Sequence, residues 1–181
     1  MKPRLFAFLR AINVGGHTVT MDTLRAIFED LGLKDVQTFI ASGNLHFTSP
    51  GTSVPALERK LEARLEKSLG YEVATFIRTA EEVVAIAKYR PFPDEQVLRS
   101  GAFCVGFLRQ PLDATAKQSL GSLKNEIDDF KVHGREVYWL CKVSQRDSKF
   151  SNAVFEKKTG VRVTFRGGST VTKLAAKAEP K

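Results

Sequence analysis

The spacing of apolar residues in the first half of the chain alternates between a period of two and a period of three to four. Residues 4–10 carry apolar side chains on both faces, which predicts a strand covered on both sides. Thr20 and Ser53 are helix-capping residues that directly precede two segments with helical spacing. The predicted elements are a strand over 4–10, a helix over 21–31, strands over 35–40 and 45–48, a helix over 55–69 and a strand over 73–77.

The second half of the chain repeats this order. Thr79 opens a capping box for a helix that uses Val83, Ile86 and Ala87 as its apolar positions, and the prolines at 91 and 93 break the chain after it. Ser148 or Ser151 caps a later helix, which Gly160 ends. The predicted elements are a strand over 102–108, a weak helix over 113–120, strands over 129–132 and 136–141, the helix before Gly160, a strand over 161–165 and a helix over 169–176.

The order βαββαβ therefore occurs twice, and each time it predicts two helices on one face of a four-stranded antiparallel sheet. The sequence predicts an α+β protein built from two tandem ferredoxin-like modules. We expect the first module over 1–79, a helical connector over 80–100, the second module over 101–166, and a C-terminal helix and tail over 167–181. The two halves share no obvious residue identity, so the predicted repeat is one of architecture.

The composition is that of a globular protein. Of 181 residues, 43% are apolar and 27% are charged, which excludes wholesale disorder. No apolar run reaches the length of a membrane span, and the N-terminus lacks the pattern of a secretory signal. Cys104 and Cys141 lack the spacing of a metal site or a redox motif. We therefore expect a cytoplasmic protein with no membrane partner, and the sequence leaves its oligomeric state open.

The net charge of +8 is concentrated near the C-terminus. Residues 142–181 contain ten basic and three acidic side chains. A hypothetical patch for an anionic partner consists of Lys149, Lys157, Lys158, Arg162, Arg166 and Lys173. Two interpretations stay open: a surface that binds nucleic acid, or a solvated face. The strands lack the basic-glycine-aromatic run with which RNA-recognition modules stack bases, so support for nucleic acid is weak.

The densest group of polar and glycine residues follows the first predicted strand. In the predicted fold this loop lies at the same end of the sheet as the turn between the second and third strands. We call the combined group the Gly-rich rim, and its hypothetical ligand-binding residues are Arg10, Asn13, Gly15, Gly16, His17, Ser42 and Asn44. Either these residues form tight turns and satisfy backbone groups, or they bind a small anionic or polar ligand. The spacing matches neither a P-loop nor a dinucleotide fingerprint.

Evidence for catalysis is thin. The three histidines, His17, His46 and His133, have no partners at metal-ligand spacing, and no nucleophile elbow occurs. Both cysteines lie in predicted strands, where small core residues are expected. Catalytic residues are therefore unknown, and we expect no metal and no cofactor. An enzyme that uses His17 as a general base in the Gly-rich rim stays an alternative.

Several motifs together resemble the family called domain of unknown function 1697. They are the run from Leu9 to Gly16, Met21-x-x-Leu24-Arg25, Leu31-Gly32, Asp35-Val36-x-Thr38, Ser42-Gly43-Asn44, Pro91-Phe92-Pro93, Phe107-Leu108 with Pro111, Ser148-Lys149 with Asn152, and Thr170 to Leu174. The resemblance implies an uncharacterised bacterial cytoplasmic protein with two ferredoxin-like halves. It implies no established activity, so it supplies no catalytic residues.

Two positions depart from that family's usual pattern. Where the family commonly has Arg-Asn-Trp-Asn-Thr before the last helix, this chain has Arg166-Gly167-Gly168-Ser169-Thr170. His17 stands where a lysine or arginine is frequent. A ligand pocket completed by the first of these segments would therefore be altered in this protein.

The function that we expect is binding of a small anionic or polar ligand at the Gly-rich rim by a cytoplasmic protein. Nucleic-acid binding through the basic C-terminal half is one alternative. An enzyme of unknown reaction that uses the same rim is the other. The ligand itself, and whether the basic region and the rim share one surface, do not follow from the sequence.

Overall fold

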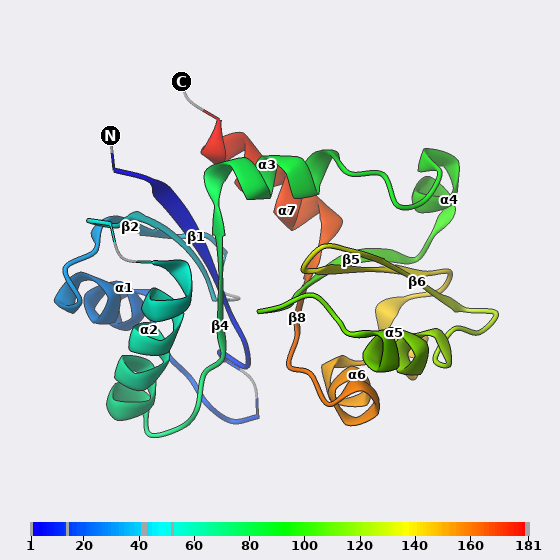
Figure 1. The fold of residues 1–181 in the computed structure, drawn as a ribbon, viewed down its shortest axis with the longest axis horizontal. Helices are drawn as coiled ribbons and strands as arrows, with labels where there is room; N and C mark the ends of the chain where they lie inside the picture. Colours follow the sequence, from blue (N-terminus) through cyan, green and yellow to red (C-terminus); the bar gives the residue numbers. More distant parts are fainter. Residues whose placement is uncertain (1, 14, 41–42, 52, 180–181) are drawn as a thin grey trace. The chain divides into compact units, whose positions relative to one another are not determined.

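The computed structural model of the protein describes residues 2–13, 15–40, 43–51 and 53–179. The chain divides into two units, Met1–Val84 with Leu174–Lys181, and Ala85–Lys173. Each unit contains one four-stranded antiparallel sheet with α-helices on one of its faces (Figure 1). The predicted α+β fold with two ferredoxin-like sheets is confirmed.

Apart from a short helix over 94–99 and a 3₁₀ turn over 145–147, the elements follow the predicted order. The first unit contains β1 (Arg4–Leu9), α1 (Met21–Asp30), β2 (Lys34–Thr38), β3 (Asn44–Thr48), α2 (Val54–Leu69), β4 (Thr75–Thr79) and the start of α3 (Ala80–Lys88). The second unit contains the end of α3, α4 (Asp94–Arg99), β5 (Ala102–Phe107), α5 (Ala114–Gly121), β6 (Asp128–His133), β7 (Glu136–Cys141), a 3₁₀ turn (Gln145–Asp147), α6 (Asn152–Thr159), β8 (Thr164–Gly167) and the start of α7 (Gly168–Ala178).

The sheet of the first unit has the strand order β2-β3-β1-β4. Helices α1 and α2 lie on one face of it (Figure 1). Leu5, Ala7 and Leu9 of β1 join the core cluster that includes Phe28 of α1 and Leu61 of α2. The alternation along β1 therefore places every second side chain against the helices, as the period of two predicts.

Local capping signals define the helix ends. The side chains of Thr20 and Ser53 accept hydrogen bonds from backbone N–H groups in the first turns of α1 and α2. Gly70 ends α2 in the left-handed conformation, which glycine adopts without steric cost. For α6 the cap is Ser151, whose hydroxyl accepts from the N–H of Val154. These caps explain why the helix starts could be predicted from short sequence patterns.

Ser148, the alternative cap, stabilises the second sheet instead. Its hydroxyl donates to the carboxylate of Asp128, at 2.8 and 2.9 Å to the two oxygens. The same carboxylate accepts from Nε1 of Trp139 at 2.8 Å. Asp128 and Trp139 are both 2% exposed, so the carboxylate satisfies an indole N–H that is cut off from water. This network ties β6, β7 and the segment before α6 together.

The fourth strand of each unit begins later than predicted. The apolar pattern predicted strands over 73–77 and 161–165, whereas β4 and β8 begin at Thr75 and Thr164. Val73 and Val163 are fully buried, but they lie before the strands. Backbone N–H groups at these entries donate to glutamates of the preceding helices, from Thr75 to Glu62 and from Val163 to Glu156. The apolar pattern therefore identified two valines that are buried in the core. These valines are not part of the hydrogen-bonded strands.

Helix α4 was not predicted as a separate element. It begins directly after Pro93, and none of its six residues is buried. A helix without a buried face has no apolar periodicity, so the pattern showed only a break at the prolines. None of the helices in the described part of the chain has the length and apolar character that a membrane crossing needs.

Gly101 provides a test of the packing at the start of β5. Its N–H donates to the carbonyl of Cys141 at 2.8 Å, and a Cβ at this position would overlap the carbonyl of Val143. We expect Gly101→Ala to lower the free energy of unfolding by about 1–3 kcal/mol, because the Val143 backbone must move. Urea denaturation measures this effect. Gly121→Ala is the matched control, because a Cβ there meets nothing within 4 Å. Equal unfolding midpoints for the two variants would contradict the expected clash.

Candidate functional site

The loop after β1 lies against the turn between β2 and β3. The N–H of Leu9 donates to the carbonyl of Gly43 at 2.8 Å, and the N–H of Arg10 donates to the carbonyl of Ala74 at 2.9 Å. A Cβ added at Gly43, where φ is +75°, would lie 3.1–3.3 Å from side-chain atoms of Leu9 and Ile12. Backbone contacts therefore hold the loop and the turn together at this end of the first sheet.

The two asparagines of the Gly-rich rim make hydrogen bonds within their own loops. Asn13 Oδ1 accepts from the N–H of Val19 at 2.6 Å. Asn44 is 1% exposed, and its Nδ2 donates to the carbonyl of Phe39 at 3.1 Å. Both amides therefore make local hydrogen bonds of the kind that stabilises turns. Ser42 lies outside the described residues.

The other members of the Gly-rich rim are nearer the surface. Gly15, Gly16 and His17 are exposed, and Arg10 is half-buried. The ring of His17 stacks on the ring of Tyr71, with 3.9 Å between centroids and 26° between planes. The Tyr71 hydroxyl is buried and has no hydrogen-bond partner among the described residues. Burial also raises the pKa of Tyr71.

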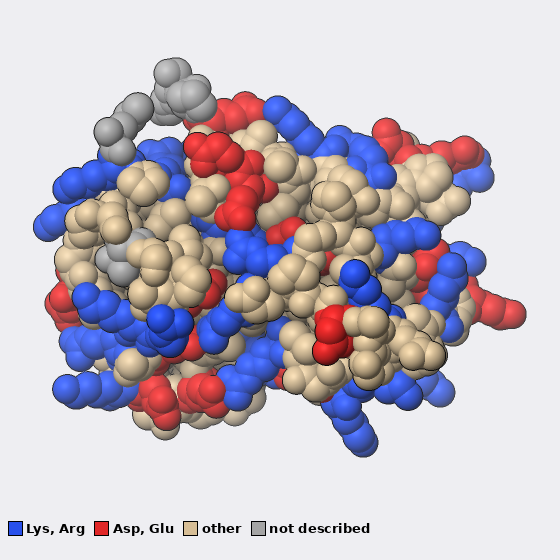
Figure 2. Space-filling model, in the orientation of Figure 1, with Lys and Arg blue, Asp and Glu red and all other residues tan. Residues whose placement is uncertain are grey.

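The basic residues of the hypothetical anion patch do not share one environment. Lys149, Lys157, Lys158, Arg162 and Lys173 are exposed. Arg166 is only 8% exposed, and its Nη1 donates to Thr164 Oγ1 at 2.6 Å and to the carbonyl of Phe165 at 3.0 Å. Burial lowers the pKa of Arg166 to about 10. In the view of Figure 2, lysine and arginine side chains are interspersed with acidic ones.

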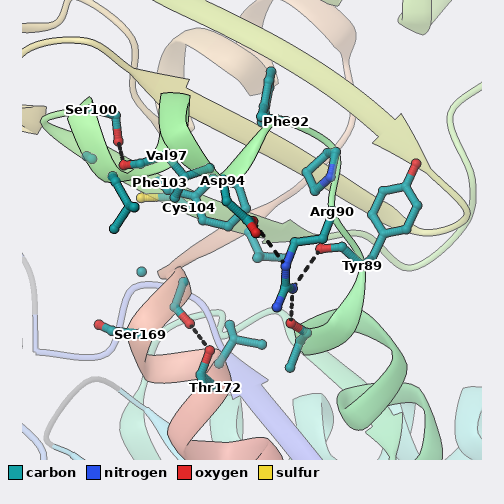
Figure 3. A pocket seen from close by; sticks show the side chains of 18 of the residues that line it. Tyr89, Arg90, Phe92, Asp94, Val97, Ser100, Phe103, Cys104, Ser169 and Thr172 are labelled. Carbon is teal, nitrogen blue, oxygen red and sulfur yellow. Dashed lines mark hydrogen bonds and ion pairs between the residues drawn. The ribbon is translucent and has the colours of Figure 1, made fainter.

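A cavity of about 730 Å³ lies within the second unit. We call it the α4 cavity. Its walls come from five places: residues 86–92 at the end of α3 and after it, helix α4, residues 100–105 up to and along the start of β5, Gln145 of the 3₁₀ turn, and residues 167–172 at the start of α7. In Figure 3, Asp94 and Val97 enter from α4, while Ser169 and Thr172 enter from α7. Segments far apart in sequence therefore form one concave site.

Aromatic contacts hold the chain segment that forms this cavity. Phe92 is 3% exposed and lies edge-on to Phe103 of β5, with 6.3 Å between centroids and 87° between planes. Tyr138 of β7 contacts both Phe103 and Tyr89, at 6.3 and 5.1 Å between centroids. These side chains lie on the face of the second sheet opposite the core cluster that contains Cys104 and Trp139. The segment between α3 and β5 is thus anchored on the face that α5 and α6 leave uncovered.

A few polar groups lie among the apolar walls of the α4 cavity. Arg90 Nε lies 3.3 Å from Asp94 Oδ1, and Arg90 Nη1 donates to the carbonyl of Ala87 at 2.9 Å. Thr172 Oγ1 donates to the carbonyl of Gly168 at 3.0 Å, so its lone pairs stay available as acceptors. Ser169 adds an exposed hydroxyl. This combination of apolar walls with few oriented polar groups is typical of small-molecule sites.

Sequence patterns did not identify the α4 cavity. Its walls come from residues 86–105, from Gln145 and from residues 167–172, which are far apart in the chain, and α4 lacks an apolar period. The two signals that pointed toward it were the Pro91-Phe92-Pro93 segment and the Gly167-Gly168 pair before the last helix. A Cβ at Gly168 would lie 2.7 Å from Phe103 Cδ1, so the start of α7 approaches the Phe103 ring closely because glycine stands there.

Neither cysteine has the properties of a nucleophile. Cys104 lies at the wall of the α4 cavity but is 3% exposed, and burial raises the pKa of its thiol to about 12. Cys141 is fully buried, and burial raises its pKa as well. A thiol in such surroundings stays protonated at neutral pH. Within the described residues, no group of three or more His, Cys, Asp or Glu side chains is arranged to hold a metal ion.

Thiol reactivity tests this assignment. We expect native protein at pH 8 to react with Ellman's reagent far more slowly than free cysteine, because both thiols are buried and protonated. In guanidinium chloride both thiols should react at once. Ser169→Cys is the positive control, because it adds an exposed thiol at the mouth of the same cavity. A native thiol that reacts as fast as this control would contradict the assignment.

Comparisons with known proteins agree with the fold. A family model described as "Protein of unknown function (DUF1697)" matches residues 2–138. No curated protein matches the chain. The solved structure of the conserved bacterial protein SP0830 from Streptococcus pneumoniae is 23% identical in sequence, with 99% of this chain and 100% of that chain covered and a TM-score of 0.73. At this identity the likeness establishes the architecture alone.

Proposed function

The chain belongs to the DUF1697 family, and we propose that this member binds a small molecule in the α4 cavity. The observation that supports this function is a cavity of about 730 Å³ with aromatic walls and few polar groups. Small-molecule sites commonly measure roughly 300–1,000 Å³ and have this kind of lining. The cavity lies within one unit, so its shape depends on that unit's own packing.

The lining indicates the chemistry of the ligand. Phe92, Phe103 and Val97 offer apolar surface against which a flat or aliphatic body can pack. Arg90 Nη1 donates to the Ala87 carbonyl, so part of its guanidinium is already oriented before a ligand arrives. A restrained guanidinium loses less freedom when it binds a carboxylate or phosphate. The ligand class that fits is an apolar, aromatic-sized molecule with one anionic or polar group.

The Gly-rich rim is a second candidate for a small polar ligand. The observation in its favour is the buried Tyr71 hydroxyl, which has no hydrogen-bond partner among the described residues and belongs to the ring that His17 stacks on. A ligand bound there would supply the missing hydrogen bond. The two asparagines would act only indirectly, since they hold their own loops. The α4 cavity remains the stronger candidate because it encloses a volume and combines apolar with charged groups.

Three naphthalene probes test the α4 cavity and its polar preference. They are 2-naphthoate, 2-naphthyl phosphate and 2-naphthol, and binding is measured by saturation-transfer NMR and by isothermal titration. We expect Ser169→Trp to abolish binding, because an indole at this wall would take up part of the cavity from α7. Thr115→Trp is the matched control, since Thr115 is exposed on α5 and does not line the cavity. Arg90→Met should weaken the two anionic probes by roughly tenfold, the equivalent of one charge-assisted hydrogen bond, and leave 2-naphthol unchanged.

Two results would overturn the proposal. One is that none of the three probes binds the wild-type protein. The other is that Ser169→Trp and Thr115→Trp bind the probes equally well, which would place binding elsewhere. In that second case, probe binding by His17→Ala and Tyr71→Phe shows whether the Gly-rich rim is the site. The first variant removes the exposed imidazole, and the second removes the hydroxyl that has no hydrogen-bond partner among the described residues.

A further inference from the structure

Helix α4 has almost no packing of its own. None of its residues is buried, and it begins at Pro93 without a side-chain cap. Its ion pairs, Arg99 with Glu95 at 2.7 Å and Arg90 with Asp94 at 3.3 Å, are exposed. Exposed pairs of this kind add little stability. The helix is therefore a segment of low local stability, of the kind from which mobile binding elements are drawn.

Open space borders α4 on more than one side. Asp94, Val97 and Leu98 line the α4 cavity. Gln96 and Arg99 line a separate cavity of about 560 Å³. A movement of the helix would therefore break little packed interface.

A firmly packed residue lies on each side of α4 in the chain, and the two would limit any movement of the helix. Phe92 is buried against Phe103 just before the helix. Gly101 is pressed against the Val143 backbone just after it, and its N–H is bonded to Cys141. A weakly held helix between two such anchors would stay over the cavity if it moved. This is the arrangement of a hinged wall.

Leu98 is the most exposed large apolar side chain among the described residues. It is 86% exposed, against 51% for Ile40 and 37% for Ile127. A single exposed leucine is ordinary on a protein surface. Leu98 differs from an ordinary one because it lines a cavity, next to the half-buried Val97. Its exposed surface is therefore available to an apolar group inside the cavity.

A charged residue and an apolar residue of α4 lie on the same side of the helix. Asp94 and Leu98 are four residues apart, so they occupy the same side of α4, separated by about 6 Å along the helix. Arg90 pairs with Asp94 at the first of these positions. A ligand that meets Arg90 at the start of α4 therefore reaches Leu98 only if it also has an apolar body that extends along the helix.

We infer that α4 closes on the bound molecule and that Leu98 is the residue that selects ligands with an extended apolar body. This inference rests on the proposed function, because it concerns the same cavity. In the open form Leu98 faces water, and in the closed form it packs on the end of the ligand remote from Arg90. The favoured ligand class is an anionic molecule with a body about the size of two fused rings, and single-ring molecules bind without using Leu98.

A pair of probes of different length tests the role of Leu98. We expect Leu98→Ser to weaken 2-naphthoate roughly fivefold, from the apolar area that the ligand no longer covers, and to leave benzoate unchanged. Leu98→Met should restore the preference for the longer probe. Ile40→Ser is the matched control, since it makes a comparable change on the surface of the first unit. Because Leu98 is so exposed, these variants should fold as the wild type does.

Hydrogen exchange provides an independent readout of closure. We expect 2-naphthoate to slow amide exchange over 94–99, and benzoate to slow it less, because only the longer probe holds the helix closed. If Ser169→Trp abolishes binding while Leu98→Ser leaves the ratio of the two affinities unchanged, the inference about α4 is overturned and the proposed function stands. If Ser169→Trp leaves 2-naphthoate binding intact, the proposed function and this inference fall together.

Discussion

The edge-on contact between Phe92 and Phe103 is the interaction on which the organisation of the second unit depends. An antiparallel sheet with α5 and α6 on one face leaves Phe103, Val105 and Tyr138 on the other face, and these apolar side chains must be covered. The chain between α3 and β5 covers part of that face by packing Phe92 on Phe103. The space left beside this contact is the α4 cavity. The packing that covers this face of the sheet thus also leaves the α4 cavity.

Elements specified by local chemistry were predictable. The caps at Thr20, Ser53 and Ser151 each join groups three residues apart, so the sequence contains both partners within a short window. The entries to β4 and β8 were misplaced, because the N–H groups there bond to glutamates seven and thirteen residues away. Pairing over such distances depends on the path of the chain, which apolar spacing does not describe. The same reason explains why the α4 cavity was missed.

The basic residues show how a count of charges differs from a charged surface. The C-terminal forty residues hold most of the net charge, but Arg166 is buried and bonded to Thr164 and to the Phe165 carbonyl. The same holds for two polar residues of the Gly-rich rim. The side chains of Asn13 and Asn44 make hydrogen bonds to nearby backbone groups. Residue type identifies which chemistry is available. The hydrogen-bond partner decides whether a ligand can use it.

The two units approach their fourth strands in the same manner. In each, a left-handed glycine, Gly70 or Gly160, ends the helix, and a fully buried valine follows three residues later. A glutamate of that helix then accepts a backbone N–H at the strand entry. This geometry is shared although the halves have no obvious residue identity. Glu62 and Glu156 therefore serve as acceptors at the strand entries of the two units, and loss of either carboxylate would leave a backbone N–H at the strand entry without this acceptor.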